Sequence, residues 1–289
     1  MRARAVGADI IIEDCSEFDI VHTFECGQCF RWNGCEDKTY EGVHGKNALK
    51  IGQKGDKITL YDTTIDEYEN VWKKYFDISR DYAKLQRELS CNDDVLDRAI
   101  KQGRGIRILL QDAFETIISF IISANNNIPR IKLIIERLCE TYGEKIDAYE
   151  KTFYTFPSAK TLSRLTTEDL APIKSGFRDK YILDAAKKVH SGEIDIEKIY
   201  DMEYEDAKNE LKKIKGVGEK VANCILLFGF GKQNAFPVDV WVKRILEYYY
   251  ADRYDISDVN EFAKRQFGSL GGFAQQYLFY YARQNKIAK

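Results

Sequence analysis

The chain has 289 residues, of which 44% are hydrophobic, enough for a buried core in one large domain or in two to three small ones. The formal net charge of −2 provides no overall basic field, so any nucleic-acid partner must be met by a local surface. The apolar runs are shorter than a membrane span, and the seven scattered cysteines suit reduced thiols better than disulfides. We therefore expect a globular, cytoplasmic protein without a membrane segment.

Residues 9 to about 62 alternate between apolar and polar side chains, with glycines between the runs. The stretch Lys57-Ile58-Thr59-Leu60-Tyr61 fits a strand that buries one face. We expect a small antiparallel sheet here, within an N-terminal β-rich domain of residues 1–80. The pair Cys26-x-x-Cys29 is only a weak signal for metal or redox chemistry, because no second pair accompanies it.

Beyond this sheet the apolar spacing becomes helical and remains so to the C-terminus. Asp112 and Asp258 fit the N-caps of two helices, and the apolar residues of 128–142 are spaced for one helix face. The sequence thus predicts an α+β protein, with an N-terminal antiparallel sheet lobe followed by a mostly α-helical body of residues 81–289. We expect the C-terminal helix to pack back on the first domain.

The segment "LKKIKGVGEKVANCI", residues 211–225, predicts two short helices joined by a tight turn, within a helix-hairpin-helix at about residues 204–228. The turn residues are Gly216, Val217 and Gly218, and glycine permits such a close reversal. Backbone N–H groups of a turn at a helix N-terminus bind phosphate without reading base sequence. A plain helix–helix corner would use the same spacing.

Lys220 falls in the first turn of the second helix, where the positive end of the helix dipole disfavours an ammonium group. An amine attacks only in its neutral form, so this position suits a nucleophile, although a surface lysine or a phosphate contact fits it too. Cys224 lies one turn further along the same face, where a core role is the ordinary expectation. Asp239 fits a helix N-cap, and a capping carboxylate that also faces a pocket would stabilise a developing sugar cation.

Together, "LKKIKGVGEKVANCI" and "FPVDV" resemble the helix-hairpin-helix–Gly/Pro–Asp signature of the base-excision DNA glycosylases. The fragments "GQCFRW", "SANNNIPRI", "GFRDKY" and "GGFAQQYLF" narrow the resemblance to the 8-oxoguanine DNA glycosylases and extend it over residues 27 to 279. The resemblance implies a bifunctional DNA repair glycosylase and AP lyase. Such an enzyme flips 8-oxoguanine out of duplex DNA and excises it through a lysine Schiff base and β-elimination. It also implies an N-terminal sheet like that of the TATA-binding protein.

The resemblance implies a role for each matching residue. Lys220 corresponds to the nucleophile and Asp239 to the catalytic carboxylate. Four residues correspond to the lesion-base pocket: a glycine whose carbonyl accepts the N7–H that guanine lacks, a glutamine that reads the Watson–Crick edge, and two residues that sandwich the base. They are, in that order, Gly27, Gln275, Cys224 and Phe279.

Further matches concern the gap in the duplex and the opposite base. Asn125 corresponds to the residue that fills the space of the extruded base, while Arg130 and Arg178 correspond to the pair that bonds the estranged cytosine. Phe177 stands where the family commonly has a tyrosine wedge, and its ring can still stack into the gap. Trp241 departs from the family, in which histidine is common; an indole can pack on a sugar or phosphate but cannot donate two hydrogen bonds.

The resemblance implies double-stranded DNA with 8-oxoguanine opposite cytosine as the partner, and a monomer that is nucleoid-associated if the source is prokaryotic. It implies no required cofactor or metal, although a monovalent or divalent cation at the hairpin carbonyls remains an alternative. No cysteine follows Cys224, which excludes the iron–sulfur loop of related glycosylases. Two other readings stay open: a glycosylase of the same superfamily for a different damaged base, and a non-catalytic helix-hairpin-helix DNA-binding protein.

Overall fold

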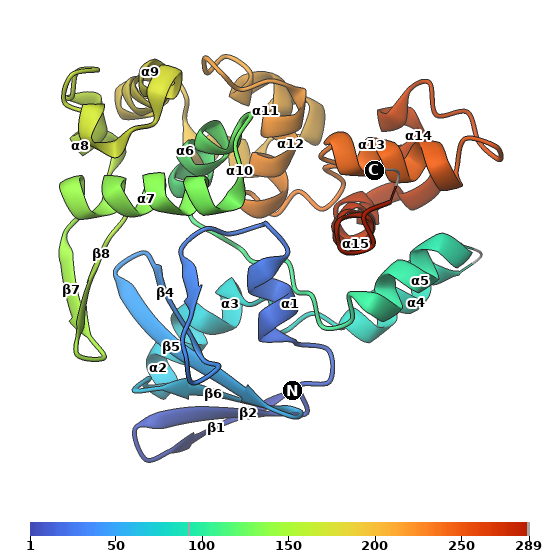
Figure 1. Cartoon of the computed structure of the whole chain (residues 1–289), viewed down its shortest axis with the longest axis horizontal. Helices are drawn as coiled ribbons and strands as arrows, with labels where there is room; N and C mark the ends of the chain where they lie inside the picture. The colour runs from blue at the N-terminus through green and yellow to red at the C-terminus, as the bar shows by residue number, and fades with distance from the viewer. Residues whose placement is uncertain (92, 288–289) are drawn as a thin grey trace.

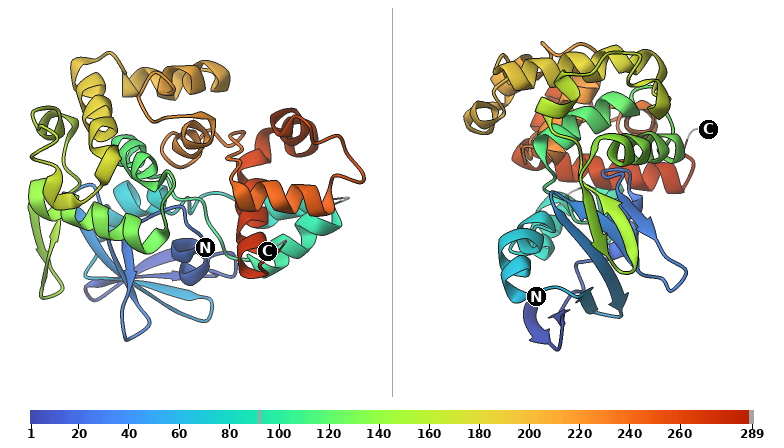
Figure 2. Two further views of the ribbon diagram at one scale, coloured as in Figure 1. Left: turned by 45° about the horizontal axis from the view of Figure 1, so that its top comes forward. Right: turned by 90° about the vertical axis from the view of Figure 1, so that its left-hand side faces the viewer.

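The computed structural model describes residues 1–91 and 93–287. The N-terminal lobe is a six-stranded antiparallel sheet with the strand order β1-β2-β6-β5-β4-β3, which confirms the predicted sheet. Figure 1 shows this sheet beneath the helical body, and Figure 2 shows the same separation from two further directions. The strands are β1 (Arg2–Val6), β2 (Asp9–Glu13), β3 (Trp32–Gly34), β4 (Tyr40–His44), β5 (Asn47–Lys54) and β6 (Lys57–Tyr61).

The alternation of the sequence gives the sheet one buried face. Ile51 lies opposite Leu60, and Leu60 lies opposite Ile10, so the apolar side chains of three strands are in register. All three side chains are fully buried. The sheet packs against α1 (Ile20–Glu25) and the helical segment Ile65–Tyr75, where Trp32 stacks on Phe24 with ring centroids 4.2 Å apart. This apolar contact fixes the end of α1 and the loop that follows it.

The helical body begins at α4 and continues to the end of the described chain. Asp112 caps α6 by accepting from the Glu115 N–H, and Asp258 caps α14 in the same way, as the sequence predicts. The helices are α4 (Tyr82–Ser90), α5 (Asp94–Gln102), α6 (Ala113–Ser123), α7 (Ile128–Tyr142), α8 (Ala159–Ser163), α9 (Asp179–Ser191), α10 (Ile196–Asp201), α11 (Tyr204–Leu211), α12 (Glu219–Phe228), α13 (Val240–Tyr249), α14 (Val259–Phe267) and α15 (Gly271–Gln284).

One segment of the body is not helical, so the prediction of an uninterrupted helical pattern is wrong there. The strands β7 (Lys145–Ala148) and β8 (Lys151–Tyr154) form an antiparallel hairpin. Contacts with the first lobe hold it: Tyr149 donates to the carbonyl of Tyr61, and Lys151 Nζ lies 2.7 Å from Glu41 Oε2. Four-residue strands gain their stability from such tertiary contacts rather than from local propensity.

Two hydrophobic cores underlie the two parts of the molecule. One core comprises buried residues between 10 and 78 together with Leu109, and the other comprises mainly residues beyond 81. The division predicted at residues 80–81 stays a prediction, since Cys26 and Phe30 belong to the second core and Leu109 to the first. The helix α15 reaches the first lobe, where the rings of His22 and Tyr280 lie 5.3 Å apart. No helix within the described residues combines the length and apolarity that crossing a membrane requires.

Candidate active site

The helix-hairpin-helix consists of α11, the turn at residues 216–218 and α12. Gly216 has φ +86°, and a Cβ at this position would lie 2.7 Å from the Tyr181 ring. Both the backbone conformation and the lack of space therefore require glycine here. Gly218 is the N-cap residue of α12, which begins at Glu219. Lys220 is therefore the second residue of the helix, in the first turn, where the sequence places it.

A cavity of about 50 Å³ lies between the hairpin, the start of α13, α15 and the loop after α1. It brings together all six residues predicted for catalysis and for the lesion base: Gly27, Lys220, Cys224, Asp239, Gln275 and Phe279. They come from both lobes and from positions far apart in the sequence. Their assembly around one cavity is the geometry that a shared chemical function requires.

The amine of Lys220 lies beside a pair of stacked aromatic rings. Its Nζ is 5.5 Å from the centroid of the Phe120 ring, and Phe120 in turn stacks on Phe228 with ring centroids 5.5 Å apart. Cys224, one turn along α12, is buried in the same wall. Burial raises the pKa of the Cys224 thiol, and the neighbouring Lys220 offsets this only in part, so the cysteine stays a neutral packing group.

Asp239 serves as a helix cap and lines the cavity at the same time. Its Oδ1 accepts from the N–H groups of Trp241 and Val242, both at 2.9 Å, at the start of α13. The two readings of this aspartate are therefore compatible. The cap bonds hold the carboxylate in place at the cavity.

Gln275 presents an unused acceptor in the cavity wall. The residue is 5% exposed, and its Oε1 is buried without a hydrogen-bond partner in the described part of the chain. A buried polar atom of this kind costs free energy unless a ligand completes it. An amide acceptor matches the N–H groups on the Watson–Crick edge of a guanine-type base.

A second group of predicted residues lies around the loop between α6 and α7. Arg178 Nη2 donates to the carbonyl of Asn125 at 2.9 Å, and its guanidinium lies 4.4 Å from the centroid of the Phe177 ring. Phe177 is 55% exposed, and Asn125 is exposed in a strained conformation with φ +50°. Arg178 contacts both residues. Arg130 is exposed in the first turn of α7.

Arg178 is not the solvated arginine that its sequence context would suggest. It is 3% exposed and also donates to the carbonyls of Ala124 and Ser175, which leaves one guanidinium N–H without a partner among the described residues. Burial, and then the charge of Arg130, lower the pKa of the Arg178 guanidinium. The N-cap of α7 is Asn127, whose side chain accepts from the Arg130 N–H. Asn125 is therefore not the residue that caps this helix.

Two family models match the chain. The N-terminal domain of 8-oxoguanine DNA glycosylase matches residues 10–117, and the HhH-GPD superfamily base excision DNA repair protein matches residues 118–265. The chain belongs to the 8-oxoguanine DNA glycosylase branch of the HhH-GPD superfamily.

Individual relatives agree with this family. The chain is 34% identical to a probable N-glycosylase/DNA lyase of Methanothermobacter thermautotrophicus, over 78% of this chain and 77% of the relative. It is 31% identical to the N-glycosylase/DNA lyase of Saccharomyces cerevisiae, over 80% and 68% of the two chains. The solved 8-oxoguanine glycosylase/lyase of Clostridium acetobutylicum, in complex with double-stranded DNA containing cytosine opposite 8-oxoguanine, superposes with a TM-score of 0.94 at 40% identity over 99% of both chains.

In this HhH-GPD hairpin, some backbone N–H and C=O groups already form hydrogen bonds within the protein. The Val217 N–H donates to the carbonyl of Ile214 at 3.1 Å, whereas the N–H groups of Gly216 and Gly218 have no such bond within the described residues. Phosphate binding at the turn remains a prediction and rests on the two glycines. The Lys213 carbonyl accepts from Lys188 Nζ at 2.8 Å, so a cation would find fewer free carbonyls here than on an open turn. Within residues 1–91 and 93–287, no cluster of His, Cys, Asp or Glu is arranged to hold a metal ion.

Sequence reasoning missed several residues that line the cavity. Phe120 gave no local signal because it lies among the apolar residues of a helix that is buried on all sides, whereas Gln276 could have been found as a second polar residue in an apolar helix. The missed residues are Cys26, Phe120, Phe228, Pro237 and Gln276.

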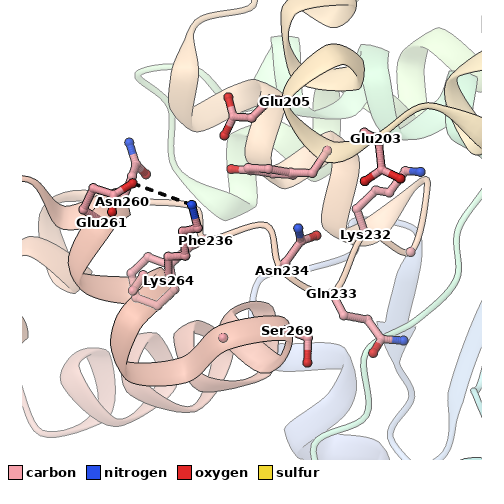
Figure 3. A pocket seen from close by; sticks show the side chains of 14 residues that line it. Glu203, Glu205, Lys232, Gln233, Asn234, Phe236, Asn260, Glu261, Lys264 and Ser269 are labelled. Atoms are coloured by element: carbon pink, nitrogen blue, oxygen red, sulfur yellow. Dashed lines mark ion pairs between the residues drawn. The ribbon is translucent and has the colours of Figure 1, made fainter.

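A larger hollow of about 770 Å³ lies elsewhere, between the start of α11, the loop after α12 and α14 (Figure 3). Its labelled side chains are of mixed charge, and an ion pair joins Lys264 to Glu261 at 4.0 Å. None of the predicted site residues lines it. We therefore assign the active site to the smaller hollow, because its lining residues carry the chemistry, although the other hollow is larger.

Proposed function

We propose that this protein is a bifunctional DNA glycosylase and AP lyase that excises 8-oxoguanine from duplex DNA. The observation that carries the proposal is the one cavity that brings Lys220 and Asp239 together with the four residues predicted to contact the lesion base. The relatives named N-glycosylase/DNA lyase and the similar structure with 8-oxoguanine DNA support the same substrate.

The chemistry follows from the two catalytic residues. As the bond between C1′ and the base N9 breaks, positive charge develops on the sugar, and the Asp239 carboxylate stabilises it. The neutral amine of Lys220 attacks C1′, and the base leaves with the bonding electron pair and takes up a proton. Opening of the sugar ring gives a Schiff base between Lys220 and C1′. Loss of a C2′ proton then expels the 3′ phosphate and cuts the strand.

Selection of the lesion takes place in the pocket after the base has left the stack. Guanine and 8-oxoguanine share the Watson–Crick edge that Gln275 reads, so the distinction rests on position 7. The carbonyl of Gly27 accepts a hydrogen bond from N7–H of the lesion, whereas it meets a lone pair on guanine N7. This difference is worth a few kcal/mol, the usual cost of unpaired buried polar groups.

The opposite strand is read by the second group of residues. Phe177 and Asn125 occupy the gap in the duplex, and Arg130, with the remaining N–H of Arg178, donates to the estranged cytosine. No step uses a metal or an organic cofactor, because Lys220 and Asp239 supply the nucleophile and the charge. We propose that the protein acts as a monomer on cellular DNA in the cytoplasm, since one chain carries every group of the site.

Borohydride trapping on duplexes with 8-oxoguanine opposite each of the four bases tests this function. We expect a covalent adduct with the lesion duplexes, strongest opposite cytosine, and none with undamaged guanine. Lys220→Gln should abolish the adduct and base release while lesion binding persists. Retained turnover in that variant would refute the nucleophile assignment, and binding without any adduct in the parent would favour a non-catalytic DNA-binding protein.

A further inference from the structure

One side chain, Arg283 on α15, contacts both walls of the lesion-base cavity. Its Nη2 donates to the carbonyl of Glu25, two residues before Gly27. Its guanidinium lies 5.5 Å from the centroid of the Phe279 ring, one turn earlier in the same helix. A Cβ built on Gly27 would lie 3.4 Å from Arg283 Nη1 and 3.4 Å from Phe279 Cε1. The guanidinium of Arg283 thus links the loop that contains Gly27 to the ring of Phe279.

The contact with Glu25 also fixes the end of α1. Glu25 is the last residue of this helix, and a cation beside C-terminal carbonyls is stabilised by the helix dipole. Gln276 Nε2 donates to the next carbonyl, that of Cys26, at 3.1 Å. Through these two bonds, α15 holds the two peptide groups that lead directly into Gly27.

Gly27 and Phe279 both line the cavity, so a base that enters it lies against both residues. Because Arg283 touches both, it limits how far they separate. A wider slot would let the Gly27 carbonyl retreat from position 7 of the base. The hydrogen bond to N7–H and the repulsion from a guanine lone pair would then both weaken.

We propose that Arg283 is a positioning residue that sets the width of the lesion-base slot and, through it, the selectivity for 8-oxoguanine over guanine. This inference rests on the proposed function. Arg283 takes no part in the bond changes at C1′, and its effect passes through Gly27 and Phe279. Its removal should therefore alter binding of the flipped base more than binding of the DNA backbone.

Binding measurements in a Lys220→Gln background separate these contributions without turnover. The affinity of the protein is measured for three duplexes, which carry 8-oxoguanine, guanine or a tetrahydrofuran abasic-site analogue opposite cytosine. The abasic analogue has no base to enter the slot. Arg283→Ala should lower the ratio of 8-oxoguanine to guanine affinity about tenfold, as expected for a lost charge-assisted contact, and leave abasic-site affinity unchanged. Arg283→Lys, which keeps the charge, should restore part of the ratio.

Arg265→Ala is the matched control, because Arg265 on α14 also donates to a backbone carbonyl, that of Asp255 at 3.3 Å, away from the cavity. This control should keep the parent ratio. An equal loss of affinity for lesion and abasic duplexes in Arg283→Ala, or no loss at all, would overturn the inference and leave Arg283 as a plain helix cap. A parent protein that does not prefer the 8-oxoguanine duplex would instead refute the proposed function, and the inference would fall with it.

Discussion

Asp239 combines two duties in one side chain, because its Oδ1 caps α13 while the carboxylate lines the cavity. Asp239→Asn keeps an oxygen acceptor for the cap but removes the negative charge. We expect 8-oxoguanine release to slow by on the order of 10²–10³-fold, the usual cost of losing a preorganised electrostatic group, with little change in thermal stability. Single-turnover kinetics and thermal unfolding measure the two effects.

Asp258 offers the control for this prediction, since it caps α14 with the same two-bond pattern and lies outside the cavity. Asp258→Ala should lower the free energy of unfolding by about 1 kcal/mol and leave base release unchanged. If Asp239→Asn lost stability rather than activity, the aspartate would be a cap and nothing more.

The two predicted cytosine-reading arginines should respond differently to removal. Arg130 is exposed, so Arg130→Ala should relax the preference for cytosine opposite the lesion with a stability change within about 0.5 kcal/mol. Arg178→Ala removes four hydrogen bonds to buried or half-buried carbonyls and should lower the free energy of unfolding by about 2 kcal/mol or more. Excision rates across the four opposite bases, together with urea unfolding, test both; an unchanged opposite-base ranking would remove Arg130 from the reading pair.

At the scale of elements, the hairpin turn provides a matched pair of glycines. Gly216 has φ +86° and faces Tyr181, whereas Gly218 has ordinary φ and open space where a Cβ would go. Gly216→Ala should therefore cost about 1–3 kcal/mol of stability and displace the start of α12, with a loss of lyase activity. Gly218→Ala should fold normally, and any weakening would appear in DNA binding alone. Equal stability of the two variants would contradict this account of the turn.

The hairpin also shows which elements sequence reasoning could predict. Its helices, its turn and the position of Lys220 follow from local spacing and glycine chemistry, which the chain carries within a few residues. The hairpin β7–β8 could not be found in this way, because contacts with Tyr61 and Glu41 of the other lobe stabilise it. The burial of Arg178 was hidden for the same reason: its partners are carbonyls of a distant loop.

At the scale of the whole molecule, the cavity exists only where the two lobes meet. Gly27 follows α1 of the first lobe, Lys220 and Asp239 belong to the helical body, and Phe279 lies on the C-terminal helix. The resemblance could predict these residues, but their assembly around one cavity and the contacts of Arg283 with both sides depend on the packing of the lobes. A loss of docking between the lobes would therefore disable selection and chemistry together.

His44, which packs on Tyr75 within the first lobe, makes the stability of the whole protein sensitive to acid. The residue ends β4, its ring centroid lies 4.4 Å from that of Tyr75, and burial lowers its pKa from the ordinary 6.5 to about 4. The positive charges of Arg31 and Lys74 act in the same direction, whereas Asp112 opposes them. Between pH 6.5 and 4 the unfolded chain binds a proton at His44 that the folded protein does not.

The free energy of unfolding should therefore fall as the pH drops through this window, by about 3 kcal/mol at most from this one residue. Urea unfolding of the parent and of His44→Gln at several pH values between 7 and 4 isolates the contribution, because the carboxylates titrate equally in both. The parent should lose stability more steeply than His44→Gln, whereas a variant of the exposed His190, His190→Gln, should follow the parent. Parallel curves for the parent and His44→Gln would show that the partly buried imidazole does not limit stability in acid.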